Sequence, residues 1–201
     1  MDSILQDKMN TAMWIGKSLF ERGKATGSSA NMSFLHNDII YITASNSCFG
    51  RLTLECFASV SQLGEVLGPQ KPSKELTLHK LLYEKSAHIG AVLHTHSFYA
   101  TLWSCFPHTC DNDILPDYTP YLKMKVGKIG LIPYAKPGSP QLFDAFAKRV
   151  RLNDGFLLRN HGPIVGGKDL LSAFYGLEEL EESAKMAWFL RKEQKKDDML
   201  I

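Results

Sequence analysis

The chain has 201 residues, of which 44% are hydrophobic and 22% charged, the make-up of an ordinary folded protein with one sizeable core. Its formal net charge of +2, with acidic and basic residues interleaved, argues against nucleic acid as a partner. The polar first ten residues and the absence of a long apolar run argue against a secretory segment and a membrane span, so we expect a cytoplasmic protein in which residues 1–201 form a single domain.

The first part of the chain predicts a helix followed by two strands. Apolar residues recur at helical spacing over residues 4–22, and Gly23 follows where a helix would end. A loop of small residues spans 27–31. The segments 32–35 and 39–43 are rich in β-branched and aromatic side chains, and they predict two strands joined by a turn.

The middle of the chain predicts further strands around a second helix. Residues 56–60 alternate like a strand, and Pro72 breaks the chain before a helix that we expect over residues 73–85. Residues 89–93 form an apolar run whose short length favours a buried strand. A helix of uncertain start follows this strand.

The last part of the chain predicts two strands and two helices. Residues 128–134 and 154–158 have the character of strands, and residues 141–150 between them place their apolar side chains on one helical face. Residues 168–195 repeat apolar positions every three or four residues and predict the longest helix. Strands and helices at such short intervals indicate an α/β fold, with a mixed or largely antiparallel sheet and helices on its faces.

Three histidines are candidates for metal ligands. The predicted strand 89–93 runs into His94-Thr95-His96, and side chains two apart on a strand point to the same face, so His94 and His96 present their rings side by side. A catalytic metal commonly has three protein ligands and one open position, and His161 is the candidate for the third ligand. The alternative is that the pair arises by chance and that His161 is a turn residue. The other histidines are expected on the surface or in packing: His36, His79, His88 and His108.

Five short motifs occur together in one known family. They are Gly27-Ser28-Ser29-Ala30-Asn31-Met32-Ser33, Thr43-Ala44-Ser45, Pro72-Ser73-Lys74-Glu75 with His79 four residues later, His94-Thr95-His96-Ser97 and Arg159-Asn160-His161-Gly162. In their order and spacing these motifs resemble the class II aldolase/adducin family, and the resemblance spans nearly the whole chain.

The resemblance implies a three-layer α/β fold, with a central, mostly antiparallel sheet flanked by helices, assembled as a homotetramer with sites at subunit interfaces. It also implies one divalent ion per subunit, zinc with manganese or cobalt as alternatives, bound by His94, His96 and His161. The catalytic carboxylate of the family matches Glu75, for which the alternative is an ordinary exposed acid in a first helical turn. The family's phosphate-binding loops, whose short side chains leave backbone N–H groups open to an anion, match Ser28, Ser29, Asn31, Ser45, Asn46, Ser73 and Lys74.

Two motifs depart from the pattern of the family's sugar-phosphate aldolases. Ser45-Asn46 stands where those aldolases tend to have Thr-Gly, and Lys74 stands where they tend to have serine. The ammonium group of Lys74 adds a full charge beside a phosphate loop, so we expect a substrate with more negative charge than a plain sugar phosphate. The alternative is that Lys74 points into solvent.

Residues 118–127, with Ile132-Pro133-Tyr134 and Pro137-Gly138 after them, look like the subgroup of the family that decarboxylates 3-oxo-tetronate 4-phosphate. That resemblance implies a metal-dependent carbon–carbon lyase that converts a phosphorylated sugar acid to dihydroxyacetone phosphate and carbon dioxide through a metal-chelated enediolate. Tyr121 matches a catalytic tyrosine that reaches a neighbouring subunit's site in related aldolases, although here it can equally be a packing residue. The alternatives are a retro-aldolase acting on a ketose 1-phosphate of the fuculose or rhamnulose type, a pentulose-phosphate 4-epimerase and a non-catalytic adducin-like module.

Overall fold

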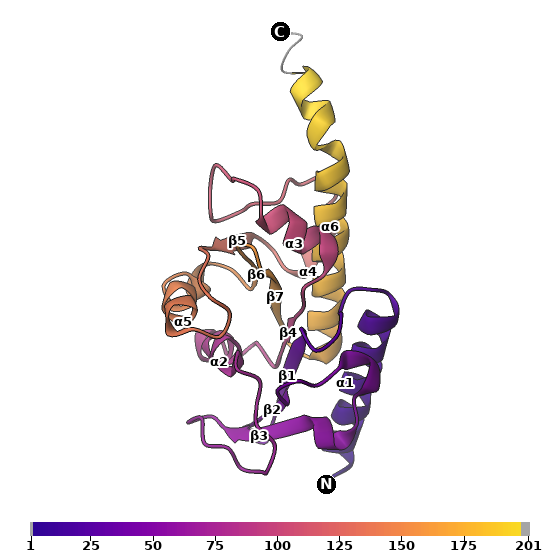
Figure 1. Ribbon diagram of the computed structural model, residues 1–201, viewed down its shortest axis with the longest axis vertical. Coiled ribbons are helices and arrows are strands. Elements are labelled where there is room, and N and C mark those ends of the chain that lie inside the picture. Colours follow the sequence, from indigo (N-terminus) through magenta and orange to yellow (C-terminus); the bar gives the residue numbers. More distant parts are fainter. Residues whose placement is uncertain (1, 198–201) are drawn as a thin grey trace.

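Within residues 2–197, which the computed structural model describes, seven strands form one sheet with helices on both faces (Figure 1). The strand order is β3-β2-β1-β4-β7-β6-β5. Neighbouring strands pair antiparallel except β5 and β6, which are parallel. The strands are β1 (Asn31–His36), β2 (Ile39–Thr43), β3 (Phe57–Ser61), β4 (Ala91–His94), β5 (Ile129–Ile132), β6 (Gly155–Leu158) and β7 (Gly162–Gly167).

Two groups of helices form the outer layers. One group packs with Leu93 of the sheet in a shared apolar core and consists of α1 (Ser3–Glu21), α3 (Phe98–Ser104), α4 (Tyr121–Lys125) and α6 (Leu170–Asp197). The other group packs with Val92 in a second core and consists of α2 (Leu76–Lys85) and α5 (Pro140–Ala147). The predicted α/β fold, with a mostly antiparallel sheet between helices, is confirmed. None of the described helices combines the length and the apolar character needed to cross a membrane.

Strand β4 lies at the centre of the sheet and directs a histidine to one face. Leu93 packs toward α1 and α6, whereas Val92 packs toward α2 and α5. Because side chains alternate along a strand, His94 shares the face of Val92 and therefore lies under α2. On the neighbouring strand β1, Asn31 is the register partner of His94, and Ser33 is the partner of Val92. The same face of the sheet thus carries polar side chains from both strands.

Three elements differ from the sequence-based expectation. The helix expected from residue 73 begins only at Leu76, with Glu75 as its N-cap residue. Strand β7 was not predicted, because a segment containing glycine and proline has low intrinsic strand propensity and gains its order from pairing with β4 and β6 on both sides. The short helix α4 was also not predicted, since its few residues carry too little periodicity.

The parallel pair β5–β6 depends on Asn153. Its side chain is buried, and its Nδ2 donates hydrogen bonds to the backbone oxygens of Lys128, at 2.8 Å, and Asn112, at 2.9 Å. We expect Asn153→Ala to lower the free energy of unfolding by about 2 kcal/mol, because two hydrogen bonds donated by a buried amide are lost. Urea denaturation measures the change, and Leu152→Ala, at a side chain that is 61% exposed, is the matched control. Equal losses of stability in the two variants would show that the hydrogen bonds of Asn153 do not stabilise the fold.

Candidate active site

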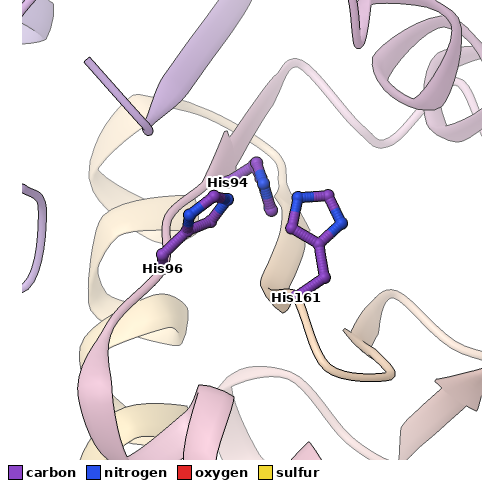
Figure 2. Close-up of side chains that lie close together, drawn as sticks. All are labelled: His94, His96 and His161. Atoms are coloured by element: carbon purple, nitrogen blue, oxygen red, sulfur yellow. The ribbon is translucent and has the colours of Figure 1, made fainter. Parts of the chain in front are cut away.

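Three histidine rings face one another at the end of β4 (Figure 2). His94 is the last residue of β4, His96 follows two residues later, and His161 directly precedes β7. The ring centroids of His94 and His96 are 5.1 Å apart, and each lies 4.8 Å from the centroid of His161. The rings meet because β4 and β7 are neighbours in the sheet, although the two segments are far apart in the sequence.

Gly162 allows the two backbones to approach closely. A Cβ atom added at Gly162 would lie 2.3 Å from the carbonyl oxygen of Thr95 and 3.2 Å from the Cα of His96. Thr95 N also donates a hydrogen bond to the carbonyl oxygen of Pro163 at 3.3 Å. Any side chain at position 162 would therefore push His96 and His161 apart. His161 itself lies in a turn, as the alternative reading of the sequence held, and in this turn it also faces the other two rings.

The unpartnered atoms of this cluster fit a metal ion. The Nδ1 of His94 lies 2.8 Å from the carbonyl oxygen of Pro163, which can only accept, so Nδ1 carries the proton and Nε2 has the free lone pair. The Nε2 atoms of His94 and His96 are buried and have no hydrogen-bond partner among the residues that the structure describes. One nitrogen from each of the three histidines lies within 4.8 Å of the others. Tetrahedral zinc needs nitrogens about 3.4 Å apart, so small shifts of the rings close the set around one ion.

Burial keeps the three imidazoles uncharged. Burial, which is the largest cause, and the neighbouring His96 together lower the pKa of His94 to about 3. Burial also lowers the pKa of His161 to about 3, with a further contribution from His94. The pKa of His96 is lowered mainly by burial as well. Neutral imidazole is the form that binds metal, so the cluster is ready to accept a cation near neutral pH.

The carboxylate of Glu75 lies beside the histidines. Its Oε2 is 3.3 Å from the Nε2 of His94, and its Oε1 is 3.4 Å from the Nε2 of His161. Because both rings are neutral, these contacts are not ion pairs. Glu75 is only 3% exposed, so the alternative that it is an ordinary surface acid is wrong. Its Oε1 is buried and no described residue forms a hydrogen bond with it, which leaves this oxygen available to a bound ligand.

A cavity of about 320 Å³ opens beside Glu75 and the histidines. Three loops that are distant in the sequence form its walls: the loop before β1, the loop after β2 and the loop before α2. All seven residues expected in phosphate-binding loops line this cavity, together with Ala30, Ala44, Glu75, His96, Pro137 and His161. The structure thus brings the candidate phosphate loops and the candidate metal ligands to one space.

The serine hydroxyls of these loops differ in whether they can still donate a hydrogen bond to a ligand. Ser29 Oγ donates to the carbonyl oxygen of Thr26, and Ser45 Oγ donates to that of Pro72, so both hold the loops in place. Ser73 Oγ instead accepts from the backbone N–H of Glu75, which leaves its own hydrogen free for an anion. These contacts make Ser73 a better candidate for direct phosphate binding than Ser29 or Ser45.

The departure at position 46 has a conformational explanation. Asn46 has a φ of 67°, in the left-handed region that glycine adopts without cost. Asparagine tolerates this region better than most other residues. Asn46 therefore keeps the turn that a glycine at this position would make, and it adds an amide side chain to the wall of the cavity.

Lys74 is exposed but lines the cavity. Its stem packs against the turn at Gly138, where an added Cβ would lie 2.9 Å from the Cδ of Lys74. Its positive charge contributes to the lowered pKa values of His94, His96 and His161. Lys74 therefore borders the cavity with its charge, and its contact with a bound anion stays a prediction.

Tyr121 is not among the residues that line the cavity within the described part of this chain. It begins α4, and its side chain is 56% exposed. A role in packing inside its own chain therefore has little support. A contact with the site of another subunit stays a prediction.

Glu181 is a buried residue of the site region that the sequence reading missed. It is 5% exposed and accepts hydrogen bonds from Ser97 Oγ at 2.7 Å, from Tyr99 N at 3.0 Å and from Ala100 N at 2.8 Å. These contacts fix the segment that follows His96 and the start of α3. The sequence feature that could have revealed Glu181 is the presence of an acidic residue on the apolar face of the longest predicted helix.

The chain belongs to the class II aldolase/adducin family, because residues 11–188 match the family described as the class II aldolase and adducin N-terminal domain. The expected family is thereby confirmed. Over 177 residues the chain is 41% identical to the 3-oxo-tetronate 4-phosphate decarboxylase of Pectobacterium atrosepticum, a match that covers 88% of this chain and 81% of the relative.

Two further relatives connect this family membership with the fold. The L-fuculose phosphate aldolase of Methanocaldococcus jannaschii is 36% identical over 172 residues, which are 86% of this chain and 91% of that protein. The crystal structure of YgbL from Escherichia coli matches with a TM-score of 0.90 at 36% identity, covering 94% of this chain and 91% of the other. The chain is thus similar to both decarboxylases and aldolases over most of its length.

The close contact at Gly162 generates a prediction with a matched control. Gly162→Ala places a methyl group 2.3 Å from the oxygen of Thr95, and Gly90→Ala places one 2.3 Å from the oxygen of Lys168, at the other end of β4. We expect both substitutions to lower the free energy of unfolding by about 2 kcal/mol or more. Only Gly162→Ala should also weaken zinc binding, by about tenfold or more. Its methyl group would push the segments of His96 and His161 apart, whereas Gly90 lies away from the three histidines.

Zinc titration of both variants with a chromophoric chelator as competitor measures the difference. Equal zinc affinities for Gly162→Ala and Gly90→Ala would show that the contact at position 162 has no bearing on the cluster.

Proposed function

We propose that the protein is a metal-dependent carbon–carbon lyase that decarboxylates a 3-oxo-tetronate 4-phosphate to dihydroxyacetone phosphate and carbon dioxide. The observation that carries the proposal is the convergence of three neutral histidines and an unpartnered carboxylate oxygen beside a cavity of small polar loops. The similarity to the decarboxylase of Pectobacterium atrosepticum supports this choice of reaction.

We assign the metal to His94, His96 and His161, and we propose zinc, with manganese or cobalt able to replace it. Three imidazole nitrogens with one open position are typical of catalytic zinc. When bound, the ion supplies a Lewis acid that stabilises the negative charge developing on the substrate oxygens as carbon dioxide leaves.

The cavity walls hold the two charged ends of the substrate. Ser73 has a free hydroxyl hydrogen, and the loop residues Ser28 and Asn46 present short polar side chains to the same space. A 3-oxo-tetronate 4-phosphate carries a carboxylate in addition to its phosphate. Lys74 supplies the positive charge that this additional anion requires, since it lines the cavity and acts electrostatically on all three histidines.

Glu75 moves the proton in this scheme. Loss of carbon dioxide from a 3-oxo acid breaks the bond between carbon 1 and carbon 2 and leaves the electron pair as an enediolate. Carbon 2 must then gain a proton to give dihydroxyacetone phosphate. Glu75 lies beside the cluster, and its Oε1 has no hydrogen-bond partner among the described residues, so we assign this oxygen, after it takes a proton from solvent, to the proton transfer.

A retro-aldolase acting on a ketose 1-phosphate is the second candidate. The 36% identity to an L-fuculose phosphate aldolase favours it. The two reactions leave the same enediolate and differ only in the group that departs, which is carbon dioxide in one and an aldehyde in the other. The same histidines and the same Glu75 serve either reaction, so the assignment depends on the substrate.

We also propose a homotetramer, in which Tyr121 of one subunit reaches the cavity of its neighbour as a catalytic residue. The exposure of Tyr121 and its position outside its own cavity support this assignment. Phosphorylated substrates do not cross membranes freely, so we place the reaction in the cytoplasm.

Product analysis tests the reaction. The zinc-loaded protein should convert 3-oxo-tetronate 4-phosphate to equal amounts of carbon dioxide and dihydroxyacetone phosphate, because the site binds both charged ends of this acid. Fuculose, rhamnulose and ribulose phosphates should yield no aldehyde. An aldehyde from one of them, together with no release of carbon dioxide, would support the retro-aldolase instead.

Glu75→Gln is the control for this assay. It should retain zinc, because the proposed ligands remain, while its kcat falls by about 100-fold or more, as is typical when a general acid is removed.

Lys74 provides a separate prediction about substrate charge. We expect Lys74→Met to raise the KM for 3-oxo-tetronate 4-phosphate by about tenfold or more, because the site loses the charge that faces a doubly anionic substrate. Steady-state kinetics measures the change. Lys71→Met removes an exposed lysine of the same loop that lies outside the cavity lining, so its KM should stay within about twofold of the unsubstituted enzyme. Equal KM values for the two variants would show that the charge of Lys74 does not contribute to substrate binding.

A further inference from the structure

A chain of hydrogen bonds, three of them buried and the last, to Tyr83, partly buried, connects Glu75 with the far end of α2. Glu75 Oε2 lies 3.0 Å from Asn31 Nδ2, and Asn31 Oδ1 lies 2.6 Å from His79 Nε2. Ser33 Oγ then lies 2.7 Å from His79 Nδ1 and 2.6 Å from the hydroxyl of Tyr83. His79 belongs to a sequence motif to which the proposed reaction gives no role.

The periodicities of one helix and one strand create this chain. Residues 75, 79 and 83 are four apart, so they lie along one side of α2 and its N-cap. Asn31 and Ser33 are two apart on β1, and they share the sheet face that α2 covers. The two rows of side chains therefore meet between the helix and the sheet.

Burial makes the members of this chain depend on one another. His79 and Ser33 are fully buried, and Asn31 is 6% exposed. A buried polar atom without a partner is costly, and solvent cannot replace a missing partner here. The hydrogen bond at each link must therefore have a defined donor and a defined acceptor.

The chemistry of the groups sets the direction of the chain. An ionised Glu75 only accepts, so Asn31 donates from Nδ2 and has Oδ1 left to accept from His79. Burial lowers the pKa of His79 to about 3, so the ring is neutral and has one proton. That proton lies on Nε2, facing Asn31.

The remaining links follow from this tautomer. His79 Nδ1 has a lone pair and accepts from the hydroxyl of Ser33, whose oxygen accepts from Tyr83. Burial raises the pKa of Tyr83, which therefore keeps the proton that it donates. All four hydrogen bonds thus point toward the carboxylate. Protonation of Glu75 at Oε1 leaves Oε2 an acceptor, so the order is the same in both states.

We propose that His79, supported by Ser33 and Tyr83, is a positioning residue that fixes the active oxygen of Glu75. It holds the amide of Asn31 in the orientation that donates to Oε2, and it thereby leaves Oε1 as the oxygen that exchanges a proton with the substrate. The inference rests on the proposed role of Glu75 in proton transfer. It assigns the Asn31 side chain to the carboxylate, although the sequence resemblance placed Asn31 among the phosphate-binding residues.

Two substitutions at position 79 separate positioning from packing. In His79→Gln the side-chain amide lies where Nε2 was and can still donate to Asn31 Oδ1. In His79→Asn the shorter amide lies near the position of Nδ1, and it can pair with Ser33 but does not reach Asn31. Both variants keep a polar group in the buried position, so they differ chiefly in the link to Asn31.

Hydrogen exchange into dihydroxyacetone phosphate isolates the step that Glu75 performs. In D₂O the zinc-loaded enzyme should replace one hydrogen on the hydroxymethyl carbon of dihydroxyacetone phosphate with deuterium. The loss of its ¹H NMR signal measures the rate. This exchange needs proton transfer at that carbon, and it needs neither carbon dioxide nor an aldehyde. We expect His79→Asn to slow the maximal exchange rate by about tenfold or more, the effect of one hydrogen bond, with KM and zinc content unchanged. His79→Gln should retain at least about a third of the rate.

The outcomes distinguish this inference from the proposed function. If the unsubstituted enzyme exchanges and the two variants have equal rates, the positioning role is wrong and the role of Glu75 stands. If the unsubstituted enzyme does not exchange this hydrogen, the positioning role of His79 and the proton-transfer role of Glu75 are both wrong. Should His79→Asn fail to fold, Ser33→Ala decides, because it removes only the hydroxyl that donates to His79 Nδ1 and holds the ring in place. It should then slow the maximal rate by about threefold or more, and an unchanged rate overturns the inference.

Discussion

The approach of two backbones at the end of β4 is the contact on which the candidate site depends. The oxygen of Thr95 occupies the space that a Cβ atom at Gly162 would need. The antiparallel pairing of β4 with β7 brings the chain into this contact. Because the positions of His96 and His161 follow from backbone packing, their rings meet at a defined place. A sheet built from the same strands in another order would leave these side chains apart.

The electrostatic character of the site follows from its burial. Imidazole nitrogens of His94 and His96 and one oxygen of Glu75 lie close together, and within the described part of the chain they have no hydrogen-bond partners. A buried polar atom that lacks a partner costs roughly 1–3 kcal/mol, and coordination to one cation would give the imidazole nitrogens a partner. Burial also keeps the rings neutral, which removes the competition between protons and metal. The fold therefore favours occupation of the site by an ion.

The register between β1 and β4 connects the metal cluster with the interior. Asn31 lies opposite His94, so the face that carries a candidate ligand also carries the amide that holds Glu75. Helix α2 covers this face and contributes both Glu75 at its N-cap and His79 one turn later. A shift of one residue in the register would direct Asn31 to the opposite face and break the contact with Glu75. The orientation of the Glu75 carboxylate therefore depends on the pairing of β1 with β4.

The sequence by itself determined the elements with strong local periodicity, the family and the residue types of the site. The helical spacing over residues 4–22 and 168–195 matches α1 and α6, and the run before His94 matches β4. Only the tertiary structure decided the remaining features. Strand β7 is made by its neighbours because glycine and proline give it no local preference. The buried position of Glu75, the direction of the hydrogen bonds through His79 and the role of Glu181 depend on contacts between distant segments, which no local pattern encodes.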